Sequence, residues 1–437
     1  MGFSTSNAQP ATANTRLPAA AWLMAGAVLL VYVALLVLNG RDPLEGDELR
    51  YRDDVLRMQT AGFIDSAHPR LYNGPGLPLV LYPFVINDAP DWVMRLHAPL
   101  SVAAAALFLF LAARQFMPQR WALGVAGICS FHPSLMHQGW HLMPEPLAHL
   151  FMSIFLWCVI HAVQSARWWS KWHWGAMLAY FVLTMVRTVW GPVMMVTLLL
   201  GPLFMILPTW RKPARTLLLV MSGVMVLCVP FLHYTYVKTG RPLLWTSLTG
   251  ELAYWMTSAE DGENGHWYSD DMVFNDPVLN ARHGPYLREV YQKPQLECDQ
   301  LMLHEAFRRA KANPSATAYN YLCNWCRFFF GFPRSLEHER VSTLVLLFYN
   351  GLLLAALAMG IVIALLRKQT LPIVLGLLLL PTMIYLGSNT LLSTQPRYFL
   401  GIMPIVVLLT FTLLSKARWS ALLERAAENP QPVTSVS

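Results

Sequence analysis

The chain has 437 residues, of which 55% are hydrophobic and 13% are charged. Soluble domains contain about a quarter charged residues, so this composition excludes an ordinary soluble protein and indicates a polytopic membrane protein. The formal net charge of +7 does not indicate nucleic-acid binding, because Lys and Arg fall mostly in short tracts between apolar runs, where anionic lipid and membrane orientation explain them.

Ten apolar segments indicate membrane-spanning helices, because a helix that crosses a bilayer needs about twenty predominantly apolar residues. They cover residues 19–38, 94–116, 121–139, 145–163, 173–187, 190–207, 216–236, 341–366, 371–387 and 398–415. The first segment ends at a poor cleavage site, Asn39-Gly40-Arg41, so we expect a retained helix rather than a signal peptide. The sequence therefore predicts an all-α polytopic fold.

The basic residues predict how the helices are oriented. Arg and Lys gather in four links that contain no acid, namely residues 114–120, 167–171, 211–215 and 367–368. By the positive-inside rule these links are cytoplasmic, as are the tails 1–18 and 416–437. Two segments are then periplasmic, on the outer side of the inner (plasma) membrane: the loop 40–93 and the segment 237–340. The loop lies inside the N-terminal transmembrane region 19–236, and the segment precedes the C-terminal transmembrane helices 341–415.

The segment 237–340 is predicted to be a small helical region. Its polar run at 259–285 is expected to be irregular, whereas apolar positions from Leu296 through Phe307 to Ala310 predict a helix with one buried face. Asn313-Pro314 predicts the start of a further, aromatic-rich helix that ends before Gly331 and lies at the membrane interface. The cysteines of this region, Cys298, Cys323 and Cys326, permit a disulfide in an oxidising compartment without indicating one.

The loop 40–93 concentrates the acidic residues of the chain, with nine of its 25 Asp and Glu. Asp47-Glu48 opens a predicted amphipathic helix that carries Arg50 and Tyr51. A carboxylate pair at the membrane boundary is partly desolvated, which raises a pKa toward the range of a general base. The alternative is a solvated acidic loop.

The same loop continues with a Pro- and Gly-rich run, His68-Pro69-Arg70-Leu71-Tyr72-Asn73-Gly74-Pro75-Gly76-Leu77-Pro78. Pro and Gly restrict the backbone to a particular path, which makes His68, Arg70 and Tyr72 candidates for substrate binding. A re-entrant turn without substrate contact is the alternative.

Five further polar residues stand at or near the ends of apolar segments on the same predicted side. Glu145, preceded by His141, opens the fourth span, and an ionisable group at such a depth usually faces a cavity or a partner. It can also serve only as a helix cap. Arg187 and Arg397-Tyr398 suit a phosphate pocket, although both arginines can instead snorkel to the lipid headgroups.

The order of these features resembles the GT-C glycosyltransferases, in particular the protein-mannosyltransferases and the aminoarabinose transferases. Four features carry the resemblance: Asp47-Glu48 after the first span, the run from His68 to Pro78, Glu145 at the fourth span, and Pro396-Arg397-Tyr398 before the last span. The chain departs from that pattern at His141, where an Arg or Lys is often expected, and in its small outer region.

The resemblance implies roles for particular residues. Asp47 would be the general base and Glu48 its support, with Glu145 as the second carboxylate. Arg397 and Tyr398 would meet a lipid phosphate. The donor would be a polyprenyl-phosphate sugar, so no metal clamp on a nucleoside diphosphate is needed, and nothing in the sequence indicates a divalent cation or another cofactor.

The sequence therefore predicts a GT-C-like bundle that transfers a sugar to a hydroxyl of a glycolipid, a polysaccharide or a protein, with inversion at the anomeric carbon. The alternative is a secondary transporter or lipid flippase with an outward-facing polar site. Against it, the charges gather on one side and no symmetry relates the two halves of the chain.

Overall fold

The computed structural model describes residues 3–4, 17–40, 42–65, 71, 73–165, 167–244, 248–260, 263–333 and 341–416. The described part is almost entirely helical, apart from a two-residue parallel pairing of β1 (Phe3–Ser4) with β2 (Leu371–Pro372). The fold class predicted from composition and periodicity is thus confirmed at the level of an all-α protein.

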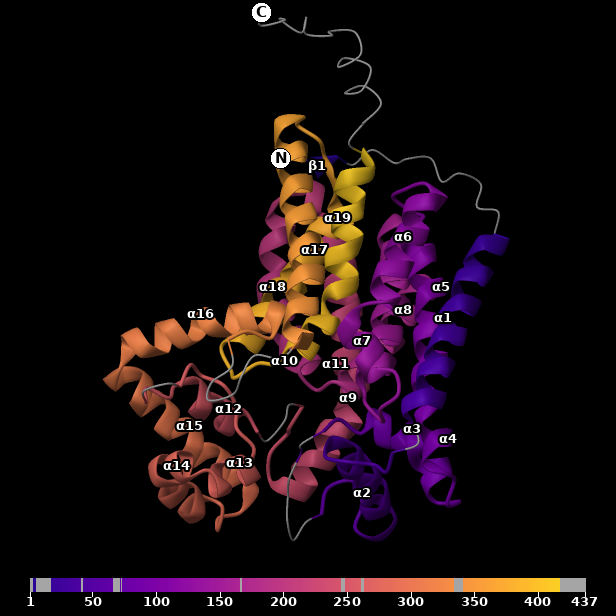
Figure 1. Ribbon diagram of the computed structural model, residues 1–437. Coiled ribbons are helices and arrows are strands. Elements are labelled where there is room, and N and C mark those ends of the chain that lie inside the picture. Colours follow the sequence, from indigo (N-terminus) through magenta and orange to yellow (C-terminus); the bar gives the residue numbers. More distant parts are fainter. Residues whose placement is uncertain are drawn as a thin grey trace, which may run out of the picture.

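The long helices form one bundle (Figure 1). They are α1 (Ala19–Asn39), α4 (Asp91–Arg95) with α5 (His97–Ala113), α6 (Gln119–Ser130), α8 (Glu145–Gln164), α9 (Lys171–Val186), α10 (Trp190–Leu200), α11 (Arg211–Thr239), α17 (Val341–Leu366), α18 (Ile373–Thr390) and α19 (Met403–Lys416). Shorter elements join them: α3 (Gly76–Val85), α7 (Pro133–Gln138) and the 3₁₀ turns η1 (Gly201–Ile206), η2 (Pro208–Trp210) and η3 (Pro396–Gly401).

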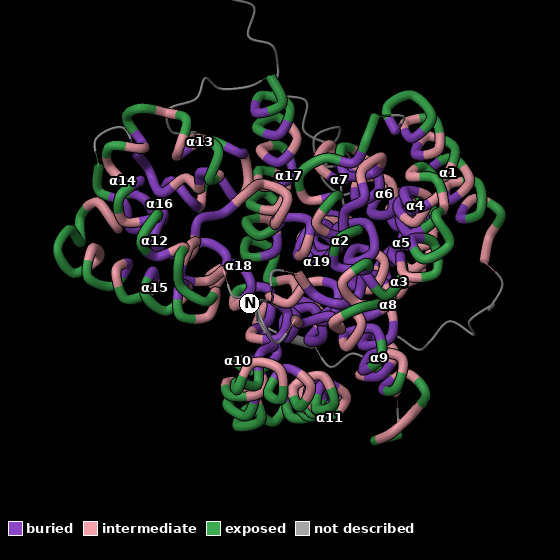
Figure 2. Tube along the Cα trace, turned by 90° about the horizontal axis from the view of Figure 1, so that it is seen from below, coloured by how far each residue is buried: buried purple, intermediate pink, exposed green. Residues whose placement is uncertain are grey.

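Small side chains set the centre of this bundle. Helix α5 packs against α1, α6 and α8, and its buried face includes Ala103, Ala105 and Ala106. Small residues let helix backbones approach closely where no water is present to drive association. Figure 2 shows the buried residues gathered around α5 and α8, whereas much of α11 at the edge of the bundle is exposed.

Within the described residues, six helices are long and apolar enough to cross a membrane: α1, α4 with α5, α8, α11, α17 and α18. The ten predicted spans fall on helical segments, apart from the start of 371–387, which lies in β2. Four of them are not one continuous α-helix, namely 94–116, 121–139, 190–207 and 398–415. Within 121–139, α6 ends at Ser130 and α7 begins at Pro133, where the His132 side chain accepts a hydrogen bond from the Ser134 amide. Proline lacks the amide proton that a continuous helix would require, so the chain breaks there.

A second group of helices lies beside one end of the bundle. It contains α12 (Thr249–Met256), α13 (Asp270–Asn275), α14 (Pro277–Val290), α15 (Gln295–Ala312) and α16 (Pro314–Phe330). In Figure 1 this outer unit and α2 (Asp47–Thr60) lie at the end opposite the start of α1 and the end of α19. The predicted topology, and with it the side of the membrane that this end faces, stays a prediction.

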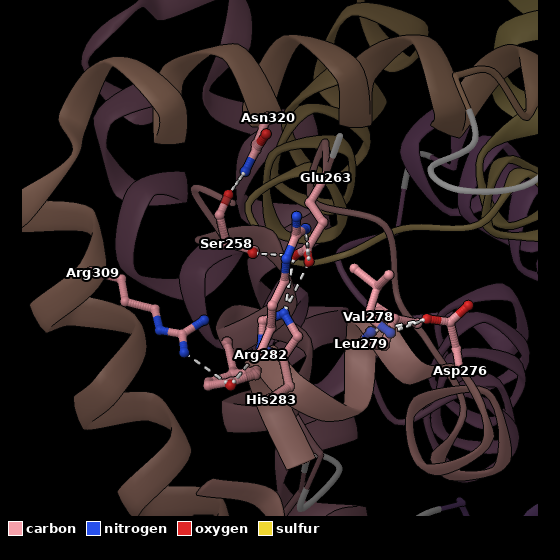
Figure 3. A network of polar contacts seen from close by, with 10 residues as sticks. Ser258, Glu263, Asp276, Val278, Leu279, Arg282, His283, Arg309 and Asn320 are labelled. Atoms are coloured by element: carbon pink, nitrogen blue, oxygen red, sulfur yellow. Dashed lines mark hydrogen bonds and ion pairs between the residues drawn. The ribbon is translucent and has the colours of Figure 1, made fainter. Parts of the chain in front are cut away.

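The outer unit has its own core and a buried polar network (Figure 3). Glu263 accepts hydrogen bonds from His283 (3.0 Å to Oε1) and from Ser258. The other ring nitrogen of His283 meets the Tyr254 hydroxyl at 2.9 Å, and that hydroxyl accepts a bond from Arg309 at 2.9 Å. Partners from three helices and a connecting segment hold the unit in one arrangement.

Two expectations for this unit were wrong. Part of the run 259–285 is helical, because Asp276 caps α14 by accepting hydrogen bonds from the amides of Val278 and Leu279, and Pro277 takes the first helical position. The second concerns α15, where Phe307 was expected on the buried face but is 69% exposed. The buried face carries Cys298, Met302 and Ala306 instead.

The predicted helix after Asn313 is confirmed as α16, which ends at Gly331 in a left-handed conformation (φ 71°). It runs across the bundle direction rather than along it (Figure 1), with Tyr319 and Leu322 exposed. All six cysteines belong to the described part of the chain, and each carries a free thiol there.

Candidate active site at the end of the bundle

The predicted carboxylate pair opens α2. Gly46 has a positive φ (52°) and turns the chain into the helix, which places Asp47 and Glu48 in its first turn. Unpaired amides at a helix N-terminus favour negative charge, so both carboxylates are stabilised there. Adjacent helical residues point in different directions. The two side chains accordingly have different surroundings.

Glu48 is buried against Arg95 of α4. Its two oxygens accept bonds from Arg95 Nε and Nη2, both at 3.0 Å, and Oε1 also accepts one from the Leu142 amide at 2.6 Å. Arg95 Nη1 also donates to the carbonyl of Gly40 at 2.7 Å. Burial opposes ionisation of Glu48, but the bonds from His141, Arg95 and Leu142 outweigh it and lower its pKa to about 2. This ion pair joins the end of α1, the start of α2 and the turn that precedes Glu145.

We expect Arg95→Met to destabilise the protein by about 3–5 kcal/mol, because it leaves Glu48 buried and charged without its partner. Thermal unfolding of the purified protein in detergent measures the effect. Arg114→Met, at the exposed end of α5, is the matched control and should unfold near the wild-type temperature. Equal unfolding temperatures for the two variants would show that the pair contributes little.

Asp47 faces the opposite direction, toward the residues that precede the last helix. Arg397 of η3 contacts Asp47 Oδ2 at 3.0 Å and lies 3.9 Å from Glu145 Oε1, while Arg187 reaches the same Glu145 oxygen at 3.2 Å. Arg50 contacts the second oxygen of Asp47 at 3.2 Å. Four elements therefore contribute to one continuous chain of charges.

This cluster has one more cation than anions, because the three arginines face two carboxylates. Burial opposes ionisation of Asp47, yet Arg397 and Arg50 outweigh it and hold the pKa of that carboxyl below its usual value. Both oxygens of Glu145 and Nε of Arg397 are buried without a hydrogen-bond partner in the described part of the chain. An anion that approaches this cluster meets arginine groups with unused donor capacity.

Aromatic side chains form the walls around the charges. A small, partly enclosed pocket lies between Glu145, Arg187 and Arg397 and is also lined by Trp190, Tyr385, Ala148, Leu400 and Gly401. The rings of Trp190 and Tyr385 stack at 4.5 Å, and the Tyr385 hydroxyl donates to the Tyr398 carbonyl at 2.9 Å. The pocket is therefore lined by charged side chains on one part and by aromatic and apolar residues on the other.

Tyr51 of α2 is buried beside the same charges, and burial raises the pKa of its hydroxyl. Tyr398 packs under the guanidinium of Arg187, with 5.2 Å between the guanidinium carbon and the ring centre. The predicted residues Asp47, Arg50, Tyr51, Glu145, Arg187, Arg397 and Tyr398 are thus brought together. His141 lies on the Glu48 side, 3.6 Å from its Oε2.

His68, Arg70 and Tyr72 lie outside the described residues. The part of their loop that is described packs tightly on the end of α9: a Cβ on Gly74 would lie 1.9 Å from the Met185 carbonyl oxygen. Asn73 is held by Asp54 Oδ2 at 3.3 Å. Only glycine permits this approach, which explains why the run needs Gly at that position.

Gly74→Ala is expected to displace this loop from α9 and to destabilise the protein by about 1–3 kcal/mol, because the new methyl group meets backbone that cannot move away. The matched control is Gly26→Ala on α1, where nothing lies within 4 Å of an added Cβ. Thermal unfolding in detergent compares the two, and a loop that adjusts freely would leave both variants at the wild-type temperature.

Three residues of this region were not predicted: Arg95, Trp190 and Tyr385. Arg95 gave the same signal as Arg187, a lone cation at the edge of an apolar segment, whereas aromatic residues inside a span give no signal. Among the described residues, no group of three or more His, Cys, Asp or Glu is placed to hold a metal ion.

Comparison with known proteins adds a family match. Residues 74–241 match the model of the dolichyl-phosphate-mannose-protein mannosyltransferase family. This range includes Glu145 and Arg187 and leaves out Asp47 and Arg397. A search of curated protein sequences finds no match.

Two solved structures are similar in fold. One is ArnT from Cupriavidus metallidurans bound to undecaprenyl phosphate, with 15% identity and a TM-score of 0.41, covering 95% of this chain and 82% of that one. The other is the archaeal oligosaccharyltransferase AglB from Archaeoglobus fulgidus in complex with an inhibitory peptide and a dolichol-phosphate, with 13% identity and a TM-score of 0.45, covering 94% and 51%. The resemblance stated from the motifs is confirmed by the family match: over residues 74–241 this chain is similar to the dolichyl-phosphate-mannose-protein mannosyltransferases.

Proposed function

We propose that this protein is an integral-membrane glycosyltransferase that moves a sugar from a polyprenyl-phosphate donor to a hydroxyl acceptor, which is a glycolipid, a polysaccharide or a protein. The observation that carries the proposal is the position of Arg397, which contacts Asp47 and faces Glu145 beside Arg187. The family match over residues 74–241 supports the reaction class.

In the proposed reaction Asp47 accepts the proton of the acceptor hydroxyl. The hydroxyl oxygen forms a bond to the anomeric carbon as the bond from that carbon to the phosphate oxygen breaks, so the configuration inverts in one displacement. The leaving polyprenyl phosphate takes the electron pair, and Arg397 and Arg187 stabilise its charge. No metal ion has a role in this scheme.

The binding of the donor would also prepare the base. Arg397 holds the pKa of Asp47 low in the structure. A phosphate that draws the Arg397 guanidinium toward itself weakens this ion pair, and the pKa of Asp47 then rises toward the range in which a carboxylate accepts a proton effectively. Glu48, held by Arg95, would keep the start of α2 in position during this exchange.

The proposed location follows from the charges. The loop 40–93 and the region 237–340 would lie on the periplasmic side of the inner membrane, with about ten transmembrane helices between that side and the cytoplasmic tails 1–18 and 416–437. Cysteine labelling with a membrane-impermeant reagent at exposed positions of α2 and of the 167–171 link tests this: only the α2 position should react in intact cells.

The test of function is transfer of radiolabelled sugar from polyprenyl-phosphate donors in vesicles that contain the protein, with a chelator in a parallel sample. We expect label in an acceptor and no effect of the chelator. If folded protein transfers no label from any donor but moves the labelled lipid between leaflets, the flippase alternative is correct.

A further inference from the structure

Glu251 belongs to α12, a helix of the outer unit that is joined by a hydrogen bond to the segment ahead of η3. The Leu252 carbonyl accepts a hydrogen bond from the Ser393 amide at 3.1 Å, which joins α12 to the chain segment that leads into Arg397. Arg50, the partner of Asp47, is near enough to Glu251 to stabilise its charge. A ligand in contact with Glu251 would therefore lie on the same side of α2 as Arg50, the ion-pair partner of the proposed base.

Trp267 forms a pair with this carboxylate: its indole Nε1 donates to Glu251 Oε1 at 2.8 Å. The side chains of both residues are half-buried, and the indole packs on the core of the outer unit. No hydrogen bond from the described residues reaches Glu251 Oε2. The two residues thus form one half-buried pair of a carboxylate and an indole.

The segment that carries Trp267 is held firmly on both sides. Before it, Glu263 is bonded to Ser258 and His283 in the network of Figure 3, and Arg327 donates to Asn264 Oδ1 at 2.6 Å. After it, Tyr268 is 1% exposed in the core. Buried hydrogen bonds of this kind favour one conformation of the segment. The contacts before and after Trp267 therefore hold it in place against the outer unit.

We propose that Glu251 and Trp267 bind the acceptor, and that the acceptor is a carbohydrate. A sugar ring has an apolar face of C–H groups, which suits the face of an indole, and hydroxyl groups, which donate to a carboxylate oxygen. The inference rests on the proposed transferase function, since it assigns the second substrate to the same site.

Charge supports this assignment. Burial raises the pKa of Glu251 to about 7. The groups that affect its charge come from four helices: Arg50 on α2, Asp270 on α13, Tyr291 on α14, and Cys298 and Asp299 on α15. This raised pKa leaves Glu251 largely protonated below pH 7 and ionised above it. A carboxylate accepts stronger hydrogen bonds from sugar hydroxyls than a carboxylic acid does. We therefore expect sugar binding to tighten as the pH rises from 6 to 8.

Saturation-transfer NMR on the full-length protein in lipid nanodiscs tests the proposal. The probes are methyl α-mannopyranoside, methyl β-glucopyranoside and, as a protein-type hydroxyl, N-acetylthreonine methylamide. At least one glycoside should give a signal with the wild type. Trp267→Ala should reduce it at least fivefold, and Glu251→Gln should weaken binding about tenfold and remove its pH dependence.

Trp168→Ala is the matched control, since Trp168 is 72% exposed in the link 167–171, far from the outer unit in sequence. The proposal is overturned if Trp168→Ala loses as much signal as Trp267→Ala, or if Trp267→Ala keeps the wild-type signal. It is also overturned if the wild type gives no glycoside signal, or if it responds more strongly to the threonine amide.

Unfolding temperatures and undecaprenyl-phosphate binding, measured on the same samples, separate the acceptor assignment from the proposed transferase function. If the lipid binds and glycosides do not, only the acceptor assignment fails; if the wild type does not bind the lipid, the proposed function fails.

Discussion

Asp47→Asn is expected to lower the rate of sugar transfer about a thousandfold, because the amide cannot accept the proton of the acceptor hydroxyl. The rate is measured in vesicles at saturating donor, so that a change in donor affinity does not contribute. The variant keeps the shape of the side chain, and Asp47 is already partly accessible to solvent, so we expect normal folding and membrane insertion.

Donor binding separates a lost base from a damaged site. Asn at position 47 removes a negative charge that contacts Arg397, so undecaprenyl phosphate should bind as tightly as to the wild type or more tightly. Asp53→Asn, on the exposed side of the same helix, should transfer at the wild-type rate. Full transfer activity in Asp47→Asn would refute the assignment of Asp47 as the base.

Arg397→Ala is expected to weaken the binding of undecaprenyl phosphate about 10–100-fold, since a hydrogen bond between charged groups contributes about 1.5–3 kcal/mol. Affinity is measured by thermophoresis of the labelled protein with the lipid in mixed micelles. Arg397→Lys should recover part of the loss, because lysine restores the charge without the planar fork that faces Asp47 and Glu145 at once.

The control for this series is Arg52→Ala, an exposed arginine of α2, which should bind the lipid as the wild type does. Loss of Arg397 also leaves Glu145 with Arg187 alone, so unfolding temperatures must accompany the affinities. If folded Arg397→Ala binds the lipid as tightly as Arg52→Ala, the phosphate lies elsewhere and the proposed transfer mechanism is wrong.

The pH dependence of transfer tests the coupling between donor and base. If the phosphate draws Arg397 away from Asp47, the acid limb of the transfer rate should move to higher pH when the donor is bound, because the pKa of Asp47 rises. A pH profile of transfer with saturating donor, compared with the profile at low donor, measures this shift. Identical profiles would show that Asp47 titrates independently of the donor.

Local signals in the sequence predicted several elements well. The start of α8 at Glu145 and the limits of α16 were predicted, because Pro favours the first turn of a helix and Gly readily adopts the left-handed conformation that ends one. The helices in 259–285 were missed although Asp276-Pro277 is a recognisable helix start, since the polar composition of the run was given more importance. Tertiary burial against the outer core stabilises that region despite its composition.

The sequence by itself determined that this chain is a helical membrane protein with a polar loop after its first helix, because hydrophobic length and charge act locally along the chain. Only the tertiary structure decided which charges meet. Asp47 and Arg397 are 350 positions apart, and neighbouring Glu48 pairs instead with Arg95. No periodicity specifies such pairs: packing of the helices brings the groups together, and the high cost of an unpaired buried charge then selects the partner.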